Sequence, residues 1–416
     1  MIKKGSFASN FLVLFSGNGL SQIIPLLFYP LITRLFSAEE LAVRSNFIAL
    51  ASMIAIAAAG RYEMAIVLPN EKRKAMNLLS LSTRLILIVS ILAIVFYFFR
   101  ENIDAFYSKG EIGDYLIYLA PAVLLYAFTN LLTQWLNREK KYNALTSSGV
   151  ARSAFVNLMI VMFGYLSYGV FGLVIGTIIG LLVALVIMTI AAKDSFEPNL
   201  ISAQGRKEVA KEFKDFPIIN APHAFVDLFF SQFILFAFIT REFGLKELGL
   251  YAMMVGIVLA SMKAVGGAVG QLYFKEASEL HGQNKNVAPV FFRSIKLIAI
   301  FAIPISLVIY FFGPDLFAIF LSEKFRDSGV YAQIMILAFC INFIVSPVSA
   351  TPIIYRKQSI AFVFSIFGYG SGVAAIMIGS YLKLNFEETL KIFALTQCIY
   401  YVSLFIWYYS LIKKKR

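Results

Sequence analysis

Twelve apolar segments, each about as long as a bilayer-spanning helix, make up most of this 416-residue chain. A helix needs about 20 mostly apolar residues to cross the hydrocarbon core of a membrane. Hydrophobic residues account for 59% of the chain and charged residues for only 15%, whereas soluble domains carry about 25% charged residues. We therefore predict an all-α integral membrane protein with about twelve transmembrane helices, at 9–33, 45–68, 76–99, 115–136, 144–166, 170–192, 217–239, 248–271, 290–312, 329–353, 359–381 and 389–411.

Lysine and arginine residues are concentrated in every second loop between these segments. Examples are the clusters at 72–74, 138–141, 193–214 and 356–357, and the run at 413–416. Basic residues near the ends of spans favour the cytoplasmic side of a membrane. We therefore predict an even number of spans, with both the N and the C terminus in the cytoplasm.

A short motif occurs twice, about half a chain length apart. Residues 32–36 read Ile-Thr-Arg-Leu-Phe and precede Glu40-Leu41, and residues 239–243 read Ile-Thr-Arg-Glu-Phe and precede Glu247-Leu248. Two related membrane halves are typical of transporters that bind substrate between the halves. We predict an N-terminal six-helix bundle at 1–192, a cytoplasmic linker at 193–216 with a short amphipathic helix at 209–216, and a C-terminal six-helix bundle at 217–416.

Charged residues fall inside the predicted spans, and bases outnumber acids among them. A charge at the centre of a membrane helix costs about 2.5–3.5 kcal/mol on insertion scales, so a surplus of cations favours a hydrated cavity that binds an anion. The alternatives are that Arg61 pairs with nearby Glu63 and that bases near span ends extend to the membrane surface. The bases are Arg61, Arg84, Arg152, Lys263, Arg293, Lys296 and Lys391, and the acids are Glu63 and Asp227.

His223 and Asp227 lie four residues apart in the seventh predicted span and therefore share a helical face. An acid beside a histidine inside a membrane is a candidate site for a coupling proton or sodium ion. The alternative is that Asp227 only balances a nearby cation.

Prolines and glycines predict where helices bend and where they pack closely. Pro25 in the first span and Pro217 and Pro222 in the seventh predict that the first span of each half is interrupted, although at different depths. Such paired interruptions point to a binding site or a hinge. Glycines at four-residue spacing predict close helix packing. They are Gly172, Gly176 and Gly180, Gly266 and Gly270, and Gly368 and Gly372.

We expect no metal site, no cofactor and no nucleic-acid partner. Cys340 and Cys398 lie in apolar segments and are interpreted as packing residues. Two histidines cannot build a His-rich metal centre, and no G-x-x-x-x-G-K-[ST] phosphate-binding loop is present, which excludes an ATP site of that type.

Two stretches near the N terminus resemble the polysaccharide transport family of the multidrug/oligosaccharidyl-lipid/polysaccharide exporter superfamily. They are Pro-Leu-Ile-Thr-Arg-Leu-Phe-Ser-Ala-Glu-Glu at 30–40 and Glu-Met-Ala-Ile-Val-Leu-Pro at 63–69, and further similar stretches occur at 168–176, 240–251 and 271–282. The chain departs from the family at 42–44, which read Ala-Val-Arg where members carry a glycine and then an aromatic residue.

The resemblance implies two six-helix bundles around a central cavity that opens alternately to each side of the membrane. It also implies a flippase that moves a polyprenyl-diphosphate-linked oligosaccharide, of the O-antigen or capsule repeat-unit type, to the outer leaflet of the bacterial inner membrane. In relatives, spans one, two, seven and eight line the cavity. This implies lining or gating roles for Arg34, Arg61, Asp227, Arg241 and Lys263.

Arg84 and Arg152 fall outside those four spans, and we retain them as candidate substrate-binding residues on charge alone. The headgroup diphosphate carries about two negative charges, which Arg61 and Lys263 could bind by charge-assisted hydrogen bonds. The resemblance implies membrane lipid, a polysaccharide polymerase and a chain-length regulator as partners.

Three other functions stay open. A multidrug or cation antiporter of the same superfamily should carry acids in its cavity, whereas bases dominate these spans. A peptidoglycan lipid-precursor flippase commonly has additional helices. A membrane polysaccharide polymerase or ligase commonly has a large outer loop, and the outer segments 100–114 and 313–328 are short. We therefore expect that the protein is not an enzyme.

Overall fold

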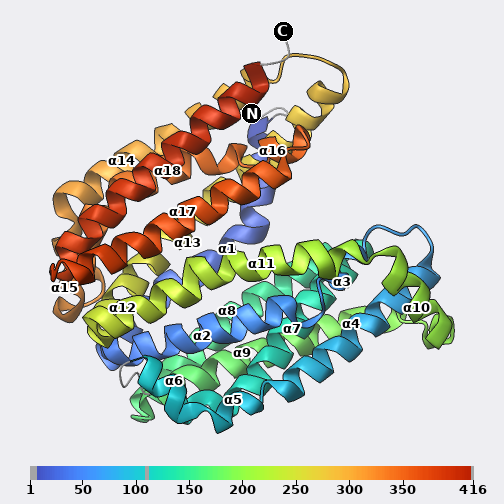
Figure 1. The fold of residues 1–416 in the computed structure, drawn as a ribbon, viewed down its shortest axis with the longest axis horizontal. Helices are drawn as coiled ribbons and strands as arrows, with labels where there is room; N and C mark the ends of the chain where they lie inside the picture. Colours follow the sequence, from blue (N-terminus) through green and yellow to red (C-terminus); the bar gives the residue numbers. More distant parts are fainter. Residues whose placement is uncertain (1–6, 108–111, 414–416) are drawn as a thin grey trace. The chain divides into compact units, whose positions relative to one another are not determined.

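The computed structural model describes residues 7–107 and 112–413, except for the side chains of 7–20, 260–261, 263–265 and 268. Every regular element in this part of the chain is helical. The residues fall into two compact units, one formed by 35–245 and the other by 1–34 together with 246–416. Figure 1 labels the helices of each unit.

The unit 35–245 contains five long helices and a seventh predicted span that is built from several short pieces. The long helices are α2 (Ala38–Ala58), α4 (Lys72–Leu92), α7 (Leu119–Arg138), α8 (Tyr142–Tyr165) and α9 (Gly169–Ala192). The seventh span runs through η4 (Phe216–Asn220), α11 (Ala221–Leu228), η5 (Phe229–Ile234) and α12 (Leu235–Phe243). The shorter elements are α3 (Tyr62–Ala65), α5 (Val95–Phe98), α6 (Arg100–Phe106), η1 (Gly113–Tyr118), η2 (Lys193–Ser195), η3 (Pro198–Leu200) and α10 (Ala203–Glu212).

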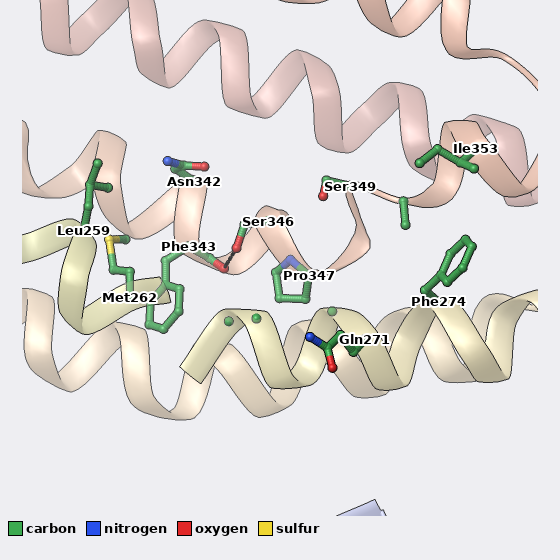
Figure 2. A pocket seen from close by; sticks show the side chains of 14 residues that line it. Leu259, Met262, Gln271, Phe274, Asn342, Phe343, Ser346, Pro347, Ser349 and Ile353 are labelled. Carbon is green, nitrogen blue, oxygen red and sulfur yellow. Dashed lines mark hydrogen bonds between the residues drawn. The ribbon is translucent and has the colours of Figure 1, made fainter. Parts of the chain in front are cut away.

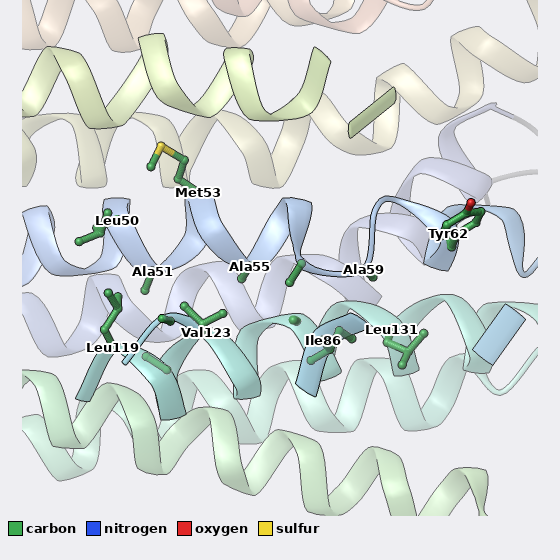
Figure 3. Packing of buried hydrophobic residues seen from close by; sticks show 14 of the residues in the cluster. Leu50, Ala51, Met53, Ala55, Ala59, Tyr62, Ile86, Leu119, Val123 and Leu131 are labelled. Carbon is green, nitrogen blue, oxygen red and sulfur yellow. The ribbon is translucent and has the colours of Figure 1, made fainter. Parts of the chain in front are cut away.

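The core of this unit forms where α2, α4 and α7 meet. Leu50 and Ala51 of α2 lie opposite Leu119 and Val123 of α7, and all four are buried (Figure 3). At the other end of α7, the fully buried Trp135 donates its indole N–H to the Ser195 hydroxyl at 2.9 Å. This bond satisfies a polar group that would be costly to bury without a partner.

The second unit contains α1 and every helix after Lys246. Its elements are α1 (Phe7–Leu35), α13 (Leu245–Gly282), α14 (Ala288–Phe320), η6 (Glu323–Phe325), α15 (Arg326–Val345), η7 (Ser346–Val348), α16 (Thr351–Ile354), α17 (Gln358–Tyr381) and α18 (Phe386–Lys413). Thr33 near the end of α1 donates its hydroxyl to the Leu321 carbonyl at 2.9 Å, and the Ser322 hydroxyl donates to the Thr33 carbonyl at 3.4 Å.

Ten helical runs in the described part of the chain are long and apolar enough to cross a membrane. The other two predicted spans, 9–33 and 248–271, fall within α1 and α13, which are 29 and 38 residues long. The prediction of an all-α, multi-pass membrane protein is therefore confirmed. The cytoplasmic location of the termini and the division at 192 and 217 stay predictions. The ten helical runs that are long and apolar enough to cross a membrane are 38–58, 72–98, 113–138, 142–165, 169–195, 216–243, 288–320, 323–354, 358–381 and 386–413.

The repeated motif has the same environment in both copies. Its threonine is buried in each copy and its arginine is exposed. Thr33 bonds to a carbonyl of its own unit, and the Thr240 hydroxyl accepts a hydrogen bond from Asn46 Nδ2 at 3.1 Å. The motif therefore anchors a helix end through a buried threonine.

Equivalent turns in the two halves of the sequence also share their backbone geometry. Lys140 and Arg356 precede α8 and α17 with φ of 56° and 53°, and Ser167 and Lys383 precede α9 and α18 with φ of 59° and 56°. After each of these residues, the next N–H bonds to the carbonyl five residues before it, at 2.7–3.1 Å. A left-handed residue commonly ends a helix in this way. The repeat is therefore visible at helix ends well away from the motif.

The glycine stripe of α9 packs against α8, as its spacing predicted. A Cβ added at Gly176 would lie 3.0 Å from the Ile160 backbone nitrogen, and one at Gly180 would lie 2.9 Å from the Val156 nitrogen. Neither contact is possible for a real side chain unless the helices separate. Gly368 and Gly372 lie equally close to side chains of α18.

The linker is held against the N-terminal end of α4. Its acidic residues Glu197, Glu208 and Glu212 form ion pairs with Lys72, Arg73 and Lys74 respectively. The predicted amphipathic helix at 209–216 forms instead as α10, where Val209 is 1% exposed. The prediction placed the helix too late because Phe213 already ends α10 and Phe216 begins the π-helical η4.

The predicted proline interruptions differ between the first and the seventh span. Pro25 and Pro30 lie inside α1 without interrupting it, so that part of the prediction was wrong. A proline removes only one backbone hydrogen bond from a helix, and membrane helices tolerate it. The seventh span contains two π-helical turns, η4 and η5, on either side of α11.

Candidate substrate-binding site

A pocket of about 760 Å³ lies between α13 and the end of α15 (Figure 2). Its walls are mostly apolar, but amide and hydroxyl groups reach it from both sides. None of the lining residues whose side chains the structure describes is charged. They are Leu259, Met262, Gly266, Gly267, Gly270, Gln271, Phe274, Asn342, Phe343, Ser346, Pro347, Ser349, Ala350 and Ile353.

The pocket exists because the tenth predicted span is interrupted. The α-helix α15 ends at Val345 and continues as the short η7, which contains Pro347, before α16 begins at Thr351. Proline has no N–H to donate and favours such an end. Hydroxyl groups satisfy backbone carbonyls near the break, since Ser346 donates to Phe343 O at 3.1 Å and Thr351 to Val348 O at 2.6 Å.

Three glycines of α13 form the opposite wall. A Cβ at Gly266 would lie 3.3 Å from the Phe343 ring, and one at Gly270 would lie 3.6 Å from Pro347. A Cβ at Gly267 would meet nothing within 4 Å. The spacing of Gly266 and Gly270 predicted close packing, and the structure shows in addition that these glycines leave room for the pocket.

Lys263 belongs to α13, but its side chain lies outside the described residues. Position 263 follows Leu259 by four residues and precedes Gly267 by four, so helical periodicity puts it on the face of α13 that carries these two lining residues.

Arg61 marks a break between α2 and α3 in the other unit. Gly60 and Arg61 are both left-handed, with φ of 59° and 60°, so the predicted span 45–68 stops being one helix here. Arg61 Nη1 lies 3.5 Å from Glu63 Oε1, and the two side chains are 21% and 5% exposed. Pairing with Glu63 was the alternative interpretation of Arg61, and the structure contains that pair.

The Arg61–Glu63 pair leaves polar atoms without partners. Arg61 Nε and Glu63 Oε2 are both buried. Arg61 Nε donates no hydrogen bond and Glu63 Oε2 accepts none within the described chain.

Arg34 and Arg241, the arginines of the repeated motif, lie exposed at helix ends. Arg34 Nη1 donates to the Pro30 carbonyl one turn back in α1, at 2.5 Å. Arg241 Nε lies 3.4 Å from Glu242 Oε1 in the last turn of α12. Neither lines the pocket.

Arg84 and Arg152 are exposed in the middle of helices. Arg84 shares its face of α4 with the exposed Leu87 and Ile88, and Arg152 shares its face of α8 with the exposed Phe155. The structure brings neither arginine to the pocket or to the Arg61–Glu63 pair.

His223 and Asp227 lie together on α11, the regular segment between the two π-helical turns. His223 is exposed and Asp227 is partly buried. Because α11 is α-helical over 221–228, the predicted shared face is preserved. π-Helical turns are frequently found at functional sites in other proteins.

No cluster of three or more possible metal ligands occurs in the part of the chain that the structure describes. The amides Gln271 and Asn342 and the hydroxyls Ser346 and Ser349 of the pocket were not predicted as site residues. Pro347 gave the one sequence signal for their location, since a proline inside a span predicts an interruption.

A family model described as "Polysaccharide biosynthesis protein" matches residues 31–330. The fold is similar to that of a multidrug resistance MATE family transporter of the MOP superfamily in an inward-facing conformation, with a TM-score of 0.74, 15% identity and 95% of each chain covered. It is also similar to the lipid II flippase MurJ in an inward closed conformation, with a TM-score of 0.75, 15% identity, and 95% of this chain and 87% of that chain covered.

A third similar structure is a MOP superfamily transporter from Pyrococcus furiosus, whose binding pocket is described as having reversed polarity. It has a TM-score of 0.63 and 14% identity, and the match covers 99% of this chain and 97% of that chain. No curated protein sequence matches the chain. At these identities the structural likeness shows the fold alone.

Proposed function

We propose that this chain, which belongs to the polysaccharide biosynthesis protein family, is a lipid-linked oligosaccharide flippase. The solved structures with a similar fold include a transporter and a flippase. It moves a polyprenyl-diphosphate-linked repeat unit from the cytoplasmic to the outer leaflet of the bacterial inner membrane by alternating access. The product feeds the synthesis of a surface polysaccharide of the O-antigen or capsule type.

The observation that carries this proposal is the chemistry of the pocket lining. Amides and hydroxyls among apolar side chains suit a neutral glycan, which presents both hydroxyl groups and apolar ring faces. A site for organic cations should contain a carboxylate to balance the charge of its ligand. The part of this lining that the structure describes contains none. The pocket therefore favours the oligosaccharide flippase over a multidrug or cation antiporter.

The diphosphate needs cations, and we propose that Lys263 and Arg61 supply them. Position 263 lies on the pocket face of α13, and Arg61 keeps a buried Nε without a hydrogen-bond partner in the described chain. Charge-assisted bonds to phosphate oxygens are about twice as strong as bonds between neutral groups. Arg34 and Arg241 are proposed to contact the headgroup at helix ends, and Arg84 and Arg152 are the remaining candidates.

The membrane potential can contribute to the driving force. One elementary charge moving across 100 mV gains about 2.3 kcal/mol, so two negative charges leaving a negative cytoplasm gain roughly 4–5 kcal/mol. Asp227 with His223 is proposed as a coupling-ion site. If the Asp227→Asn variant transports and still responds to an imposed proton gradient, this coupling role is excluded.

The experiment that tests the function is deletion of the gene in its native host, followed by analysis of the lipid-linked repeat unit. Accumulation of the completed unit on the cytoplasmic leaflet, with loss of surface polysaccharide, is the expected result. Complementation with Lys263→Gln or Arg61→Gln should restore less surface polysaccharide than the parent gene does. Polymerase and chain-length regulator partners would then be sought in the same host.

Two other results would overturn the proposal. Single repeat units on the outer leaflet would identify a polymerase or ligase instead. Unchanged surface glycan with altered tolerance to drugs or ions would identify an antiporter.

A further inference from the structure

A second pocket, of about 560 Å³, opens on the surface of the unit that contains α13 to α18, where α14, α15 and α18 meet. Most of its lining is apolar, and the aliphatic and aromatic residues at its rim are strongly exposed, with Phe311 at 65% and Leu337 at 63%. Exposed apolar side chains on membrane-spanning helices face lipid rather than water. The pocket is therefore open to the lipid phase.

One cation lines this pocket, and it forms no ion pair with a carboxylate of the described chain. Lys391 is exposed on α18, and no described carboxylate lies within ion-pair distance of its amine. Glu388, one turn away, is engaged in a capping box, in which its N–H donates to Asn385 Oδ1 at 2.9 Å and its carboxylate accepts from the Asn385 N–H at 3.3 Å.

The depth of Lys391 matches that of lipid phosphates. The 28 residues of α18 extend about 42 Å, roughly 12 Å more than the hydrocarbon core, so the helix projects at its ends. Lys391 is the sixth residue of α18, about 8 Å from the first, which places it within about one turn of the hydrocarbon boundary. By the predicted orientation this is the outer leaflet.

Polar groups beside Lys391 add to the anion site. Gln333 lines the pocket and uses one amide hydrogen to bond the Tyr310 carbonyl at 2.7 Å. An amide has two N–H donors, so a second one is available to a ligand. Tyr310 also lines the pocket and has a hydroxyl that can donate.

We propose that this lateral pocket binds one anionic phospholipid of the surrounding bilayer, with its phosphate on Lys391 and an acyl chain along Phe311, Ile334 and Leu337. A phosphodiester carries one negative charge, which a single lysine balances. The polyprenyl diphosphate of the proposed substrate carries about two, so it matches a one-cation site less well. This inference does not rest on the proposed transport function.

The test compares lipid retention by the full-length protein and two charge-removing variants. The protein is reconstituted with equal phosphatidylglycerol and phosphatidylcholine and then extracted, and retained lipids are counted by native mass spectrometry. Lys391→Gln should retain about tenfold less phosphatidylglycerol than the parent protein. Lys383→Gln is the matched control, because it removes an exposed lysine near the same end of α18 that does not line the pocket.

A third variant, Lys391→Arg, separates loss of charge from loss of fold, and it should retain phosphatidylglycerol as the parent does. Equal retention by Lys391→Gln and the parent would overturn the proposal, as would retention of phosphatidylcholine as readily as phosphatidylglycerol. Displacement of the retained lipid by an equimolar polyprenyl phosphate would also overturn it, since the pocket would then belong to the glycan carrier.

Discussion

The second and the tenth predicted spans are both interrupted, but by different chemistry. In the second, two left-handed residues end α2, and the buried Arg61–Glu63 pair follows at once. In the tenth, an uncharged Ser-Pro sequence ends α15, and the break lines the 760 Å³ pocket. A buried charge needs a partner held close to it, whereas hydroxyls and a proline can satisfy a backbone break that stays open. The break in the second span therefore holds a charged pair, and the break in the tenth span holds an uncharged pocket.

Both breaks are followed by a helix of four residues that a tyrosine anchors. The Tyr62 hydroxyl of α3 donates to the Ala210 carbonyl at 3.1 Å. The Thr351 hydroxyl of α16 bonds to the Tyr273 hydroxyl at 2.7 Å. The comparison can therefore be tested with matched variants at each break.

The largest effect is expected from removing the cation of the charged break. Arg61→Asn keeps a residue that tolerates a left-handed backbone but leaves Glu63, which is 4% exposed, without its counter-charge. We expect a loss of about 3 kcal/mol of unfolding free energy at neutral pH, measured by thermal or denaturant unfolding. The double variant Arg61→Asn/Glu63→Gln should recover most of that loss.

The matched change at the uncharged break is Ser346→Ala, which removes only one hydroxyl bond to Phe343 O. It should cost less than about 1 kcal/mol. Equal losses of unfolding free energy in Arg61→Asn and Ser346→Ala would show that the charged break is no more sensitive than the uncharged one.

The next effect tests whether the volume at the uncharged break is used. Gly267→Leu places a side chain in space where no atom lies within 4 Å of a new Cβ, so folding should be preserved while the pocket is filled. Transport of the lipid-linked oligosaccharide should fall about tenfold or more. Gly370→Leu is the control, because Gly370 of α17 is equally open but does not line the pocket. Parental transport by Gly267→Leu would show that the pocket is not used.

Substituting the two anchoring tyrosines should produce smaller and more similar losses of unfolding free energy. Tyr273→Phe removes a bond between two hydroxyls and should cost about 1 kcal/mol, because Tyr273 and Thr351 are both fully buried. Tyr62→Phe should cost no more, since the Ala210 carbonyl is only partly buried and can be hydrated. A larger loss of unfolding free energy in Tyr62→Phe than in Tyr273→Phe would contradict this prediction.

Features that depend on a single helix could be predicted from the sequence. The apolar segments located the spans, the glycine spacing predicted close helix packing at 172–180, and the motif at 32–36 and 239–243 indicated the repeat. These follow from periodicity and composition, which are local properties. The family resemblance stated from residues 30–40 and 63–69 agrees with the family match over 31–330.

The pocket could not be predicted in the same way. Whether Gly267 packs against a neighbour or faces open space depends on where the break at Pro347 places the chain opposite it. The candidate arginines show a related limit. Charge and depth left open whether Arg61 binds substrate or pairs with Glu63, and they did not reveal that Arg84 lies on an exposed apolar face. The pocket itself depends on contacts between helices that are distant in the sequence.

The division into units has a consequence for how the protein is made. The chain changes unit at residues 34–35 and again at 245–246, both within or just after a copy of the repeated motif. The helix α1 therefore leaves the ribosome first, yet the carbonyl that Thr33 binds, on Leu321, is synthesised 288 residues later. Until α13 and the later helices are made, α1 lacks its partners from its own unit, among them Gly256, which lies against the Tyr29 hydroxyl. The unit 35–245 can already complete its core by then. Synthesis order thus sets a folding order, in which the first helix is among the last to find its place.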